Sequence, residues 1–137
     1  MTLTKNSSNL GGMNSNVLKY VSVPLLTNEK CLQPHTNYPS NYITSNMVCA
    51  GIKEGGKDSC SNDSGGPLVV PRSSSDATAI IYGIVSFGTG CAKPNYPGVY
   101  ARVAKYLDWI QSYMNSKYQY HFNTIFYPID SFYLSKY

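Results

Sequence analysis

Apolar and polar side chains alternate over residues 17–26, "VLKYVSVPLL", and this alternation predicts a β-strand. The β-branched residues Val17, Val21 and Val23 also favour a strand, and Pro24 is expected at its end or at a sheet edge. The following residues, "LTNEKC", predict a helical turn with Thr27 or Asn28 as its N-cap.

Four further strands are predicted in the middle of the chain, each bounded by turn-forming residues. Loops are predicted between them at residues 33–42 and 52–66, with a turn at 72–77, because these segments are rich in Gly, Pro, Asn and Ser. Short strands separated by such turns favour an antiparallel barrel or sandwich. The predicted strands are "NMVCAG" up to Gly51, "PLVV" from Pro67, "TAIIYGIVSFG" from Thr78 and "GVYARV" from Gly98.

The periodicity then changes to that of a helix. Val103, Leu107, Ile110 and Met114 are spaced by three or four residues and predict one apolar helical face. Residues 117–137 contain eight aromatic side chains with no clear period. We therefore expect a domain over residues 1–116 and an aromatic-rich tail, of unknown role, over 117–137.

The composition indicates a folded chain with no nucleic-acid or membrane partner. Hydrophobic residues make up 42% of the 137 positions and charged residues only 13%, which favours a packed core over disorder. The net charge is +4, but lysines and arginines occur singly, without the basic runs that bind nucleic acid or anionic lipid. No apolar run is long enough to span a membrane, and residues 1–16 contain no signal-peptide core.

The four cysteines favour disulfides. Their spacing contains no C-x-x-C pair, and the chain has only two histidines, so we expect neither a metal site nor any other cofactor. Four cysteines allow three pairings, and disulfides imply an oxidising compartment. Since residues 1–16 carry no export signal, the sequence is expected to be a fragment of a longer, secreted protein.

The segment "DSGG", residues 63–66, has the features of a nucleophile turn. A nucleophilic serine must stand clear of the backbone near oxyanion donors, and glycines after it allow a tight turn and a close substrate approach. Taken alone, the same four residues are also typical of a plain turn.

Two long stretches around this segment favour a nucleophile turn over a plain turn. "CAGIKEGGKDSCSNDSGGPLVV", followed by "IVSFGTGCAKPNYPGVYARVAKYLDWI", resembles the second barrel of the trypsin-like (chymotrypsin-fold) serine proteases, from about Thr2 to Met114. The resemblance implies an all-β fold: an incomplete antiparallel Greek-key β-barrel that lacks its first strand and ends in an α-helix. A barrel short of a strand exposes two sheet edges.

The resemblance also implies site residues. Ser64 is expected to be the nucleophile, the backbone N–H groups of Asn62 and Ser64 the oxyanion hole, and Asp63 the partner of an activated N-terminus. An acidic pocket would favour substrates with Lys or Arg before the cleaved bond. The implied substrate-binding residues are Asp58, Ser59, Ser86, Phe87, Gly88 and Gly98, and the implied disulfides are Cys31–Cys49 and Cys60–Cys91.

The chain lacks other parts of the family's machinery. The catalytic histidine and aspartate precede the serine in this family, and neither His35 nor His121 matches them. Without an activated N-terminus, Asp63 would be a buried, uncompensated charge and its loop is expected to swing out. Asn62 replaces the usual glycine, and its side chain is expected to crowd the substrate.

The expected family activity is that of a secreted trypsin-like serine endopeptidase, inactive in this chain alone. The partners of a complete enzyme would be proteins or peptides with Lys or Arg at the cleavage site, and protease inhibitors. The alternative is a non-catalytic homologue that acts as a binding module or decoy.

Overall fold

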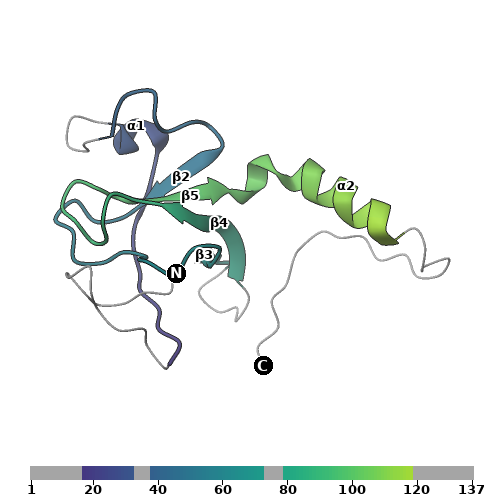
Figure 1. The fold of residues 1–137 in the computed structure, drawn as a ribbon, viewed down its shortest axis with the longest axis horizontal. Helices are drawn as coiled ribbons and strands as arrows, with labels where there is room; N and C mark the ends of the chain where they lie inside the picture. Colours follow the sequence, from purple (N-terminus) through teal and green to yellow (C-terminus); the bar gives the residue numbers. More distant parts are fainter. Residues whose placement is uncertain (1–16, 33–37, 73–78, 119–137) are drawn as a thin grey trace.

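An antiparallel sheet of five strands forms the body of the part of the chain that the structure describes. The computed structural model describes residues 17–32, 38–72 and 79–118. Within these ranges, the strands are ordered β1-β2-β5-β4-β3, with each neighbouring pair antiparallel (Figure 1). This mostly antiparallel sheet with a C-terminal helix confirms the predicted fold class, a portion of a chymotrypsin-like barrel. The strands are β1 (Leu25–Leu26), β2 (Met47–Ala50), β3 (Pro67–Pro71), β4 (Ala79–Phe87) and β5 (Gly98–Arg102).

The first predicted strand is wrong in its length. Instead of residues 17–26, only Leu25–Leu26 form β1, although Val21 makes an isolated bridge. Leu18 is 84% exposed, so alternation here does not correspond to a buried face. A strand needs a neighbour for its backbone groups, and Pro24 has no N–H to offer. The other four strands confirm their predictions, while the predicted turn at 72–77 lies almost wholly outside the described residues.

The predicted helical turn is α1 (Asn28–Cys31), and Thr27 is its N-cap. The Thr27 hydroxyl accepts a hydrogen bond from the Lys30 N–H at 3.2 Å, which satisfies one of the unpaired donors of the first turn.

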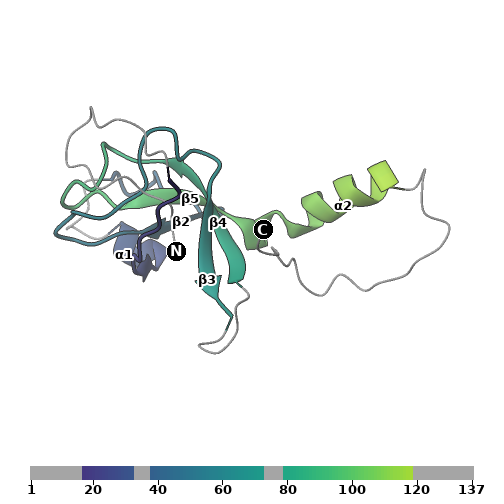
Figure 2. The same ribbon diagram turned by 90° about the horizontal axis from the view of Figure 1, so that it is seen from below.

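The second helix, α2 (Leu107–Tyr118), follows a short 3-10 turn, Val103–Lys105. Figures 1 and 2 show α2 projecting away from the sheet. Ile110 and Met114 on its predicted apolar face are half-buried, but Leu107 is 45% exposed. The helix runs past the boundary predicted at residue 116, and 119–137 lie outside the described residues.

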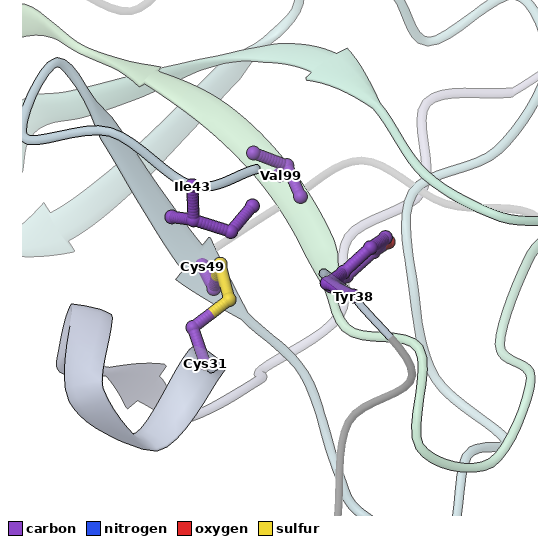
Figure 3. Close-up of a cluster of buried hydrophobic side chains, with 5 residues drawn as sticks. All are labelled: Cys31, Tyr38, Ile43, Cys49 and Val99. Carbon is purple, nitrogen blue, oxygen red and sulfur yellow. A yellow bond between two sulfur atoms is a disulfide. The ribbon is translucent and has the colours of Figure 1, made fainter. Parts of the chain in front are cut away.

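One core cluster packs α1 against the sheet around a disulfide. The Cys31–Cys49 bond joins α1 to β2, as the resemblance implies. Residues from α1, β2, β5 and the intervening loop bury their side chains together here (Figure 3). The cluster consists of Cys31, Tyr38, Ile43, Cys49 and Val99.

A second cluster lies on the opposite face of the sheet and contains Val48, Ala50, Leu68 and Tyr100. Consecutive residues of a strand point to opposite faces, so Val48 and its neighbour Cys49 serve different clusters. The centre of the sheet is therefore covered on both sides.

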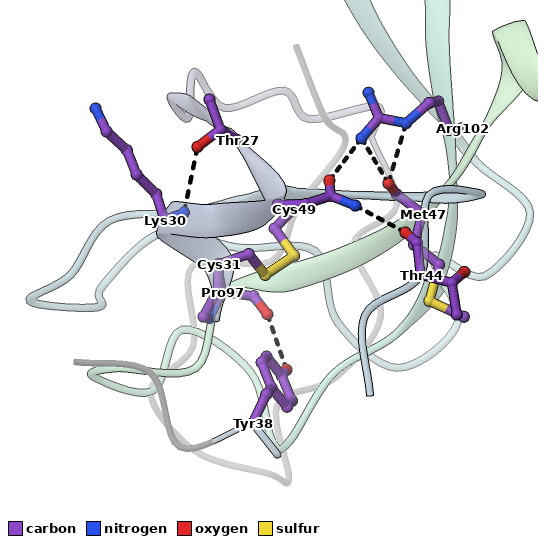
Figure 4. The surroundings of a disulfide bond; sticks show 10 residues. Thr27, Lys30, Cys31, Tyr38, Thr44, Met47, Cys49, Pro97 and Arg102 are labelled. Carbon is purple, nitrogen blue, oxygen red and sulfur yellow. Dashed lines mark hydrogen bonds between the residues drawn. A yellow bond between two sulfur atoms is a disulfide. The ribbon is translucent and has the colours of Figure 1, made fainter. Parts of the chain in front are cut away.

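Arg102, at the end of β5, connects the sheet to α1 (Figure 4). Its Nη2 donates to Asn28 Oδ1 at 2.6 Å and to the Met47 carbonyl at 2.7 Å. Its Nε donates to the carbonyls of Ser45 and Met47, both at 3.1 Å. Because these acceptors belong to three segments, one guanidinium holds α1, the 44–47 turn and β2 together.

Candidate active site

The loop between β2 and β3 carries two consecutive tight turns. In the first, the Asp63 N–H donates to the Cys60 carbonyl at 2.9 Å, and Asn62 has a φ of 74°. A positive φ at the third position of a turn requires glycine or a residue that tolerates the left-handed region, as asparagine does. Asn62 therefore occupies its backbone conformation with little strain.

The second turn presents Ser64. The Gly66 N–H donates to the Asp63 carbonyl at 2.9 Å, which places Ser64 and Gly65 at the tip of the turn. Gly65 has a φ of 82°, and a Cβ on Gly66 would lie only 2.8 Å from the Asp63 carbonyl oxygen. The "GG" pair is thus required by backbone geometry, and Ser64 is left exposed ahead of it.

Asp63 stabilises its own loop. Its Oδ2 accepts a hydrogen bond from the Cys60 N–H at 2.8 Å, across the first turn. Asp63 is half-buried. The expectation of a buried Asp63 without compensation does not hold in this respect, because the side chain is partly exposed and accepts a backbone hydrogen bond.

A pocket of about 170 Å³ opens beside Ser64. It contains Ser64 together with five of the six predicted substrate-binding residues. The lining residues are Asp58, Ser59, Cys60, Ser61, Ser64, Val85, Phe87, Gly88, Gly90 and Gly98.

Ser86 is the predicted residue that does not line this pocket. It is exposed and lies at a register shift in the pairing of β4 with β5, between Val85 and Phe87. Its predicted contact is with the backbone of a substrate, which stays a prediction. Val85 was not predicted to line the pocket, and neither were Cys60, Ser61 and Gly90. For Val85, the spacing of two residues from Phe87 in a predicted strand is a signal for a shared face.

Asp58 is the buried acidic group of the pocket, with only 5% of its surface exposed. Its Oδ1 accepts the Ser59 N–H at 2.8 Å, and its Oδ2 accepts the Ala92 N–H at 3.0 Å. Burial raises the pKa of this carboxyl from 3.8 to about 6; the two hydrogen bonds act in the opposite direction, and the charge of Asp63 adds a smaller increase.

Two glycines that line the pocket differ in the room that they leave for a side chain. A Cβ on Gly98 would lie 2.6 Å from Asp58 Oδ1, which is closer than any tolerable contact. A Cβ on Gly88 would find its nearest neighbour, the Gly90 carbonyl oxygen, at 3.5 Å. Residue 98 therefore has no room for a side chain beside the Asp58 carboxylate.

Two loops that are distant in sequence form the pocket, and several bonds hold them together. The Cys60–Cys91 disulfide joins them, as the resemblance implies. The Gly56 N–H donates to the Ala92 carbonyl at 2.9 Å, and the Asn95 N–H donates to the Lys53 carbonyl at 3.0 Å. Each backbone bond removes freedom from one loop relative to the other, so the pocket walls are preorganised.

A second pocket, of about 160 Å³, adjoins Ser64. It is lined by Asn62, Asp63, Ser64, Gly66 and Val85. Ser64 and Val85 line both pockets, so the exposed serine stands at the boundary between them.

Both histidines, His35 and His121, lie outside the described residues. Across residues 17–32, 38–72 and 79–118, no group of three His, Cys, Asp or Glu side chains is arranged to hold a metal ion. None of the helices in the described part of the chain is long and apolar enough to cross a membrane.

Comparisons with known proteins agree with this geometry. The family model described as Trypsin matches residues 3–110. "Trypsin eta" of Drosophila melanogaster is 52% identical over 99 residues, which cover 72% of this chain and 34% of that protein. "Clotting factor G beta subunit" of Tachypleus tridentatus is 45% identical, covering 70% and 32%. "Trypsin-1" of Astacus astacus is 46% identical, covering 74% and 40%.

The antiparallel sheet, the serine turn and these matches assign the chain to the trypsin-like serine protease family. The chain spans only about a third of the length of the curated relatives it matches.

Proposed function

We propose that this chain supplies the nucleophile and the primary specificity pocket of a trypsin-like serine endopeptidase that cleaves after Lys or Arg. Ser64 Oγ would attack the carbonyl carbon of the cleaved bond and form an acyl-enzyme, which water then hydrolyses. The backbone N–H groups of Asn62 and Ser64 would donate to the oxyanion that develops.

The observation that carries this proposal is that Ser64 and Asp58 line one pocket. A Lys or Arg side chain of a substrate that enters the pocket would contact the buried Asp58 carboxylate. The carbonyl group of the same substrate residue would then lie near Ser64. Within a water-poor site, a charge-assisted hydrogen bond is stronger than in bulk water. This pairing favours Lys and Arg over neutral side chains.

We further propose that the 137-residue chain alone does not turn over substrate. The attack by Ser64 requires a base to accept the hydroxyl proton, and no motif in this sequence matches the family's histidine or aspartate. The retained serine, pocket and glycines support descent from an active enzyme over the alternative, a non-catalytic binding module or decoy.

The compartment and partners follow from the same proposal. The two disulfides are stable under oxidising conditions, which supports an extracellular parent protein. Its partners would be proteins or peptides with an exposed Lys or Arg, and protein inhibitors that present such a residue.

The pocket is tested with p-aminobenzamidine, a fluorescent aromatic cation. The full chain is expected to bind it, and Asp58→Asn is expected to weaken binding at least about tenfold by removing the counter-charge. Asp108→Asn is the matched control, because Asp108 is an exposed carboxylate on α2, outside the pocket. Equal affinities of Asp58→Asn and Asp108→Asn would refute the pocket assignment.

Hydrolysis is tested separately with an arginine ester. No turnover by the pure chain is expected. Turnover that is abolished in Ser64→Ala would contradict the proposed inactivity, while supporting Ser64 as the nucleophile.

A further inference from the structure

The two disulfides of the chain differ in their exposure. Both cysteines of the Cys31–Cys49 bond are 0% exposed and lie in a core cluster. Both cysteines of the Cys60–Cys91 bond are half-buried, and Cys60 lines the Asp58 pocket. Thiol–disulfide exchange requires a thiolate to reach one of the two sulfur atoms, so the bond beside the pocket is the more accessible of the two.

The residue that follows this exposed disulfide has a strained backbone. Ala92 comes directly after Cys91 and has a positive φ of 54°. An alanine is strained there, because its Cβ approaches the following carbonyl oxygen and its side chain offers no compensating hydrogen bond. In the described ranges, the other non-glycine residues with a positive φ are Asn62 and Asn95, and asparagine tolerates this conformation better. Strain of this kind persists only where the surrounding structure fixes the backbone.

Three bonds fix the backbone around Ala92. Its N–H donates to Asp58 Oδ2 at 3.0 Å, and its carbonyl accepts the Gly56 N–H at 2.9 Å. The third bond is the disulfide at Cys91, whose partner Cys60 lies two residues after Asp58 in the sequence. Without the disulfide, the two hydrogen bonds alone would have to hold a strained residue against the carboxylate.

We propose that the Cys60–Cys91 disulfide is a redox switch for the acidic pocket. The inference rests on the proposed function, because this pocket is the one that would bind the Lys or Arg side chain. While the disulfide is intact, Ala92 is held against Asp58 and the pocket binds cations. When the disulfide is reduced, Ala92 relaxes to a negative φ, its N–H leaves the carboxylate, and the pocket loses affinity for cations.

The loss of this hydrogen bond also acts on the charge of the pocket. Burial raises the pKa of Asp58, and the hydrogen bond from Ala92 is the larger of the two that oppose this effect. Once that bond is broken, the uncharged carboxyl is favoured further. Reduction therefore weakens the counter-charge as well as the fixed geometry of the pocket.

The reductant is a dithiol, and the exchange balances in electrons and protons. A thiolate of the dithiol attacks one sulfur of the Cys60–Cys91 bond, forms a mixed disulfide and releases the other cysteine as a thiolate. The second thiolate of the dithiol then attacks the mixed disulfide and releases the first cysteine. The dithiol leaves as a disulfide and two electrons pass to the cysteine pair. Each cysteine thiolate takes up one of the two protons that the dithiol gave to solvent.

The test combines cysteine labelling with p-aminobenzamidine binding by the full chain. Treatment with dithiothreitol, followed by iodoacetamide and peptide mass spectrometry, is expected to modify Cys60 and Cys91 at least about tenfold faster than Cys31 and Cys49. At the dithiothreitol concentration that reduces only the first pair, p-aminobenzamidine affinity is expected to fall at least about tenfold, with an unchanged far-ultraviolet circular dichroism spectrum. Binding is measured before iodoacetamide is added, because a label on Cys60 would itself occupy part of the pocket.

Two variants test the proposed cause. In Ala92→Gly, the backbone adopts a positive φ without strain, so reduction is expected to lower affinity only about threefold or less. A loss as large as that of the wild-type chain would overturn the role of strain at Ala92. The double variant Cys60→Ser/Cys91→Ser is expected to bind as weakly as the reduced wild-type chain at every dithiothreitol concentration; binding as tight as that of the oxidised chain would overturn the switch.

The outcomes separate the switch from the function on which it rests. An oxidised chain that fails to bind p-aminobenzamidine overturns both the pocket and its switch. Normal binding that selective reduction leaves unchanged overturns the switch alone. So does labelling of all four cysteines at one rate, since the bond beside the pocket is then no more accessible than the buried one. A fall in affinity that accompanies loss of the folded circular dichroism signal also overturns it, because unfolding then explains the fall.

Discussion

Lowering the pH from about 7.5 to about 5 is expected to weaken p-aminobenzamidine binding about tenfold, because Asp58 takes up a proton in this range. Burial raises the pKa of Asp58 to about 6. At pH 5 only about one tenth of the molecules would then carry the counter-charge, whereas almost all carry it at pH 7.5. The ligand's amidinium keeps its charge throughout, so the change reports on the protein.

The same titration affects stability in the opposite direction. The pKa of Asp58 in the folded chain lies above the ordinary value of 3.8, so folding favours its protonated form. Its contribution to stability is fully present below pH 3.8 and is lost as the pH rises through about 6. The shift corresponds to about 3 kcal/mol. Acidification should therefore weaken ligand binding, while the protonation of Asp58 should increase the stability of the folded chain.

The assay is a fluorescence titration of p-aminobenzamidine at several pH values, with thermal unfolding measured in the same buffers. Binding that falls because the protein unfolds would be accompanied by a lower melting temperature at pH 5. An affinity that stays constant between pH 7.5 and 5 would refute the argument, since a carboxyl with its ordinary pKa remains ionised over that whole range.

Three further changes test the fold and the pocket. Gly98→Ala should reduce p-aminobenzamidine affinity at least about tenfold, because the added Cβ would lie 2.6 Å from Asp58 Oδ1. Gly88→Ala is its control: the nearest neighbour of that Cβ lies at 3.5 Å, so the affinity should change less than about twofold in the same titration. Arg102→Met should lower the free energy of unfolding in urea by about 2–3 kcal/mol, because four hydrogen bonds of the guanidinium are lost; an unchanged midpoint would contradict this. Leu68→Ala should cost about 2–5 kcal/mol in the same experiment, since Leu68 is 1% exposed and its removal leaves a cavity; a loss below about 1 kcal/mol would show that the core collapses around the site.

Much of the sheet could be predicted because the relevant signals are local. The strands that begin at Pro67 and Gly98 are bounded by glycine- or proline-containing loops and carry apolar, β-branched residues. The glycines after Ser64 could likewise be interpreted locally, since turn geometry restricts which residues can follow the tip.

The first strand shows where local signals fail. Residues 17–24 alternate as a strand does, yet only Leu25–Leu26 form β1. Alternation reports that one side of a segment can be buried, but pairing requires a neighbouring strand at the right distance. No pattern within the segment indicates whether that neighbour exists.

The sequence by itself determined the nucleophile turn, through a contiguous motif, and its resemblance to a known family implied the fold and the disulfide pairing. Only the tertiary structure decided how these parts meet. The Ala92 N–H of one loop donates to Asp58 Oδ2 of another at 3.0 Å, and Gly98 packs against the same carboxylate. Ser64 lines two pockets. The physical reason is that burial, and with it the raised pKa of Asp58, depends on residues far apart along the chain.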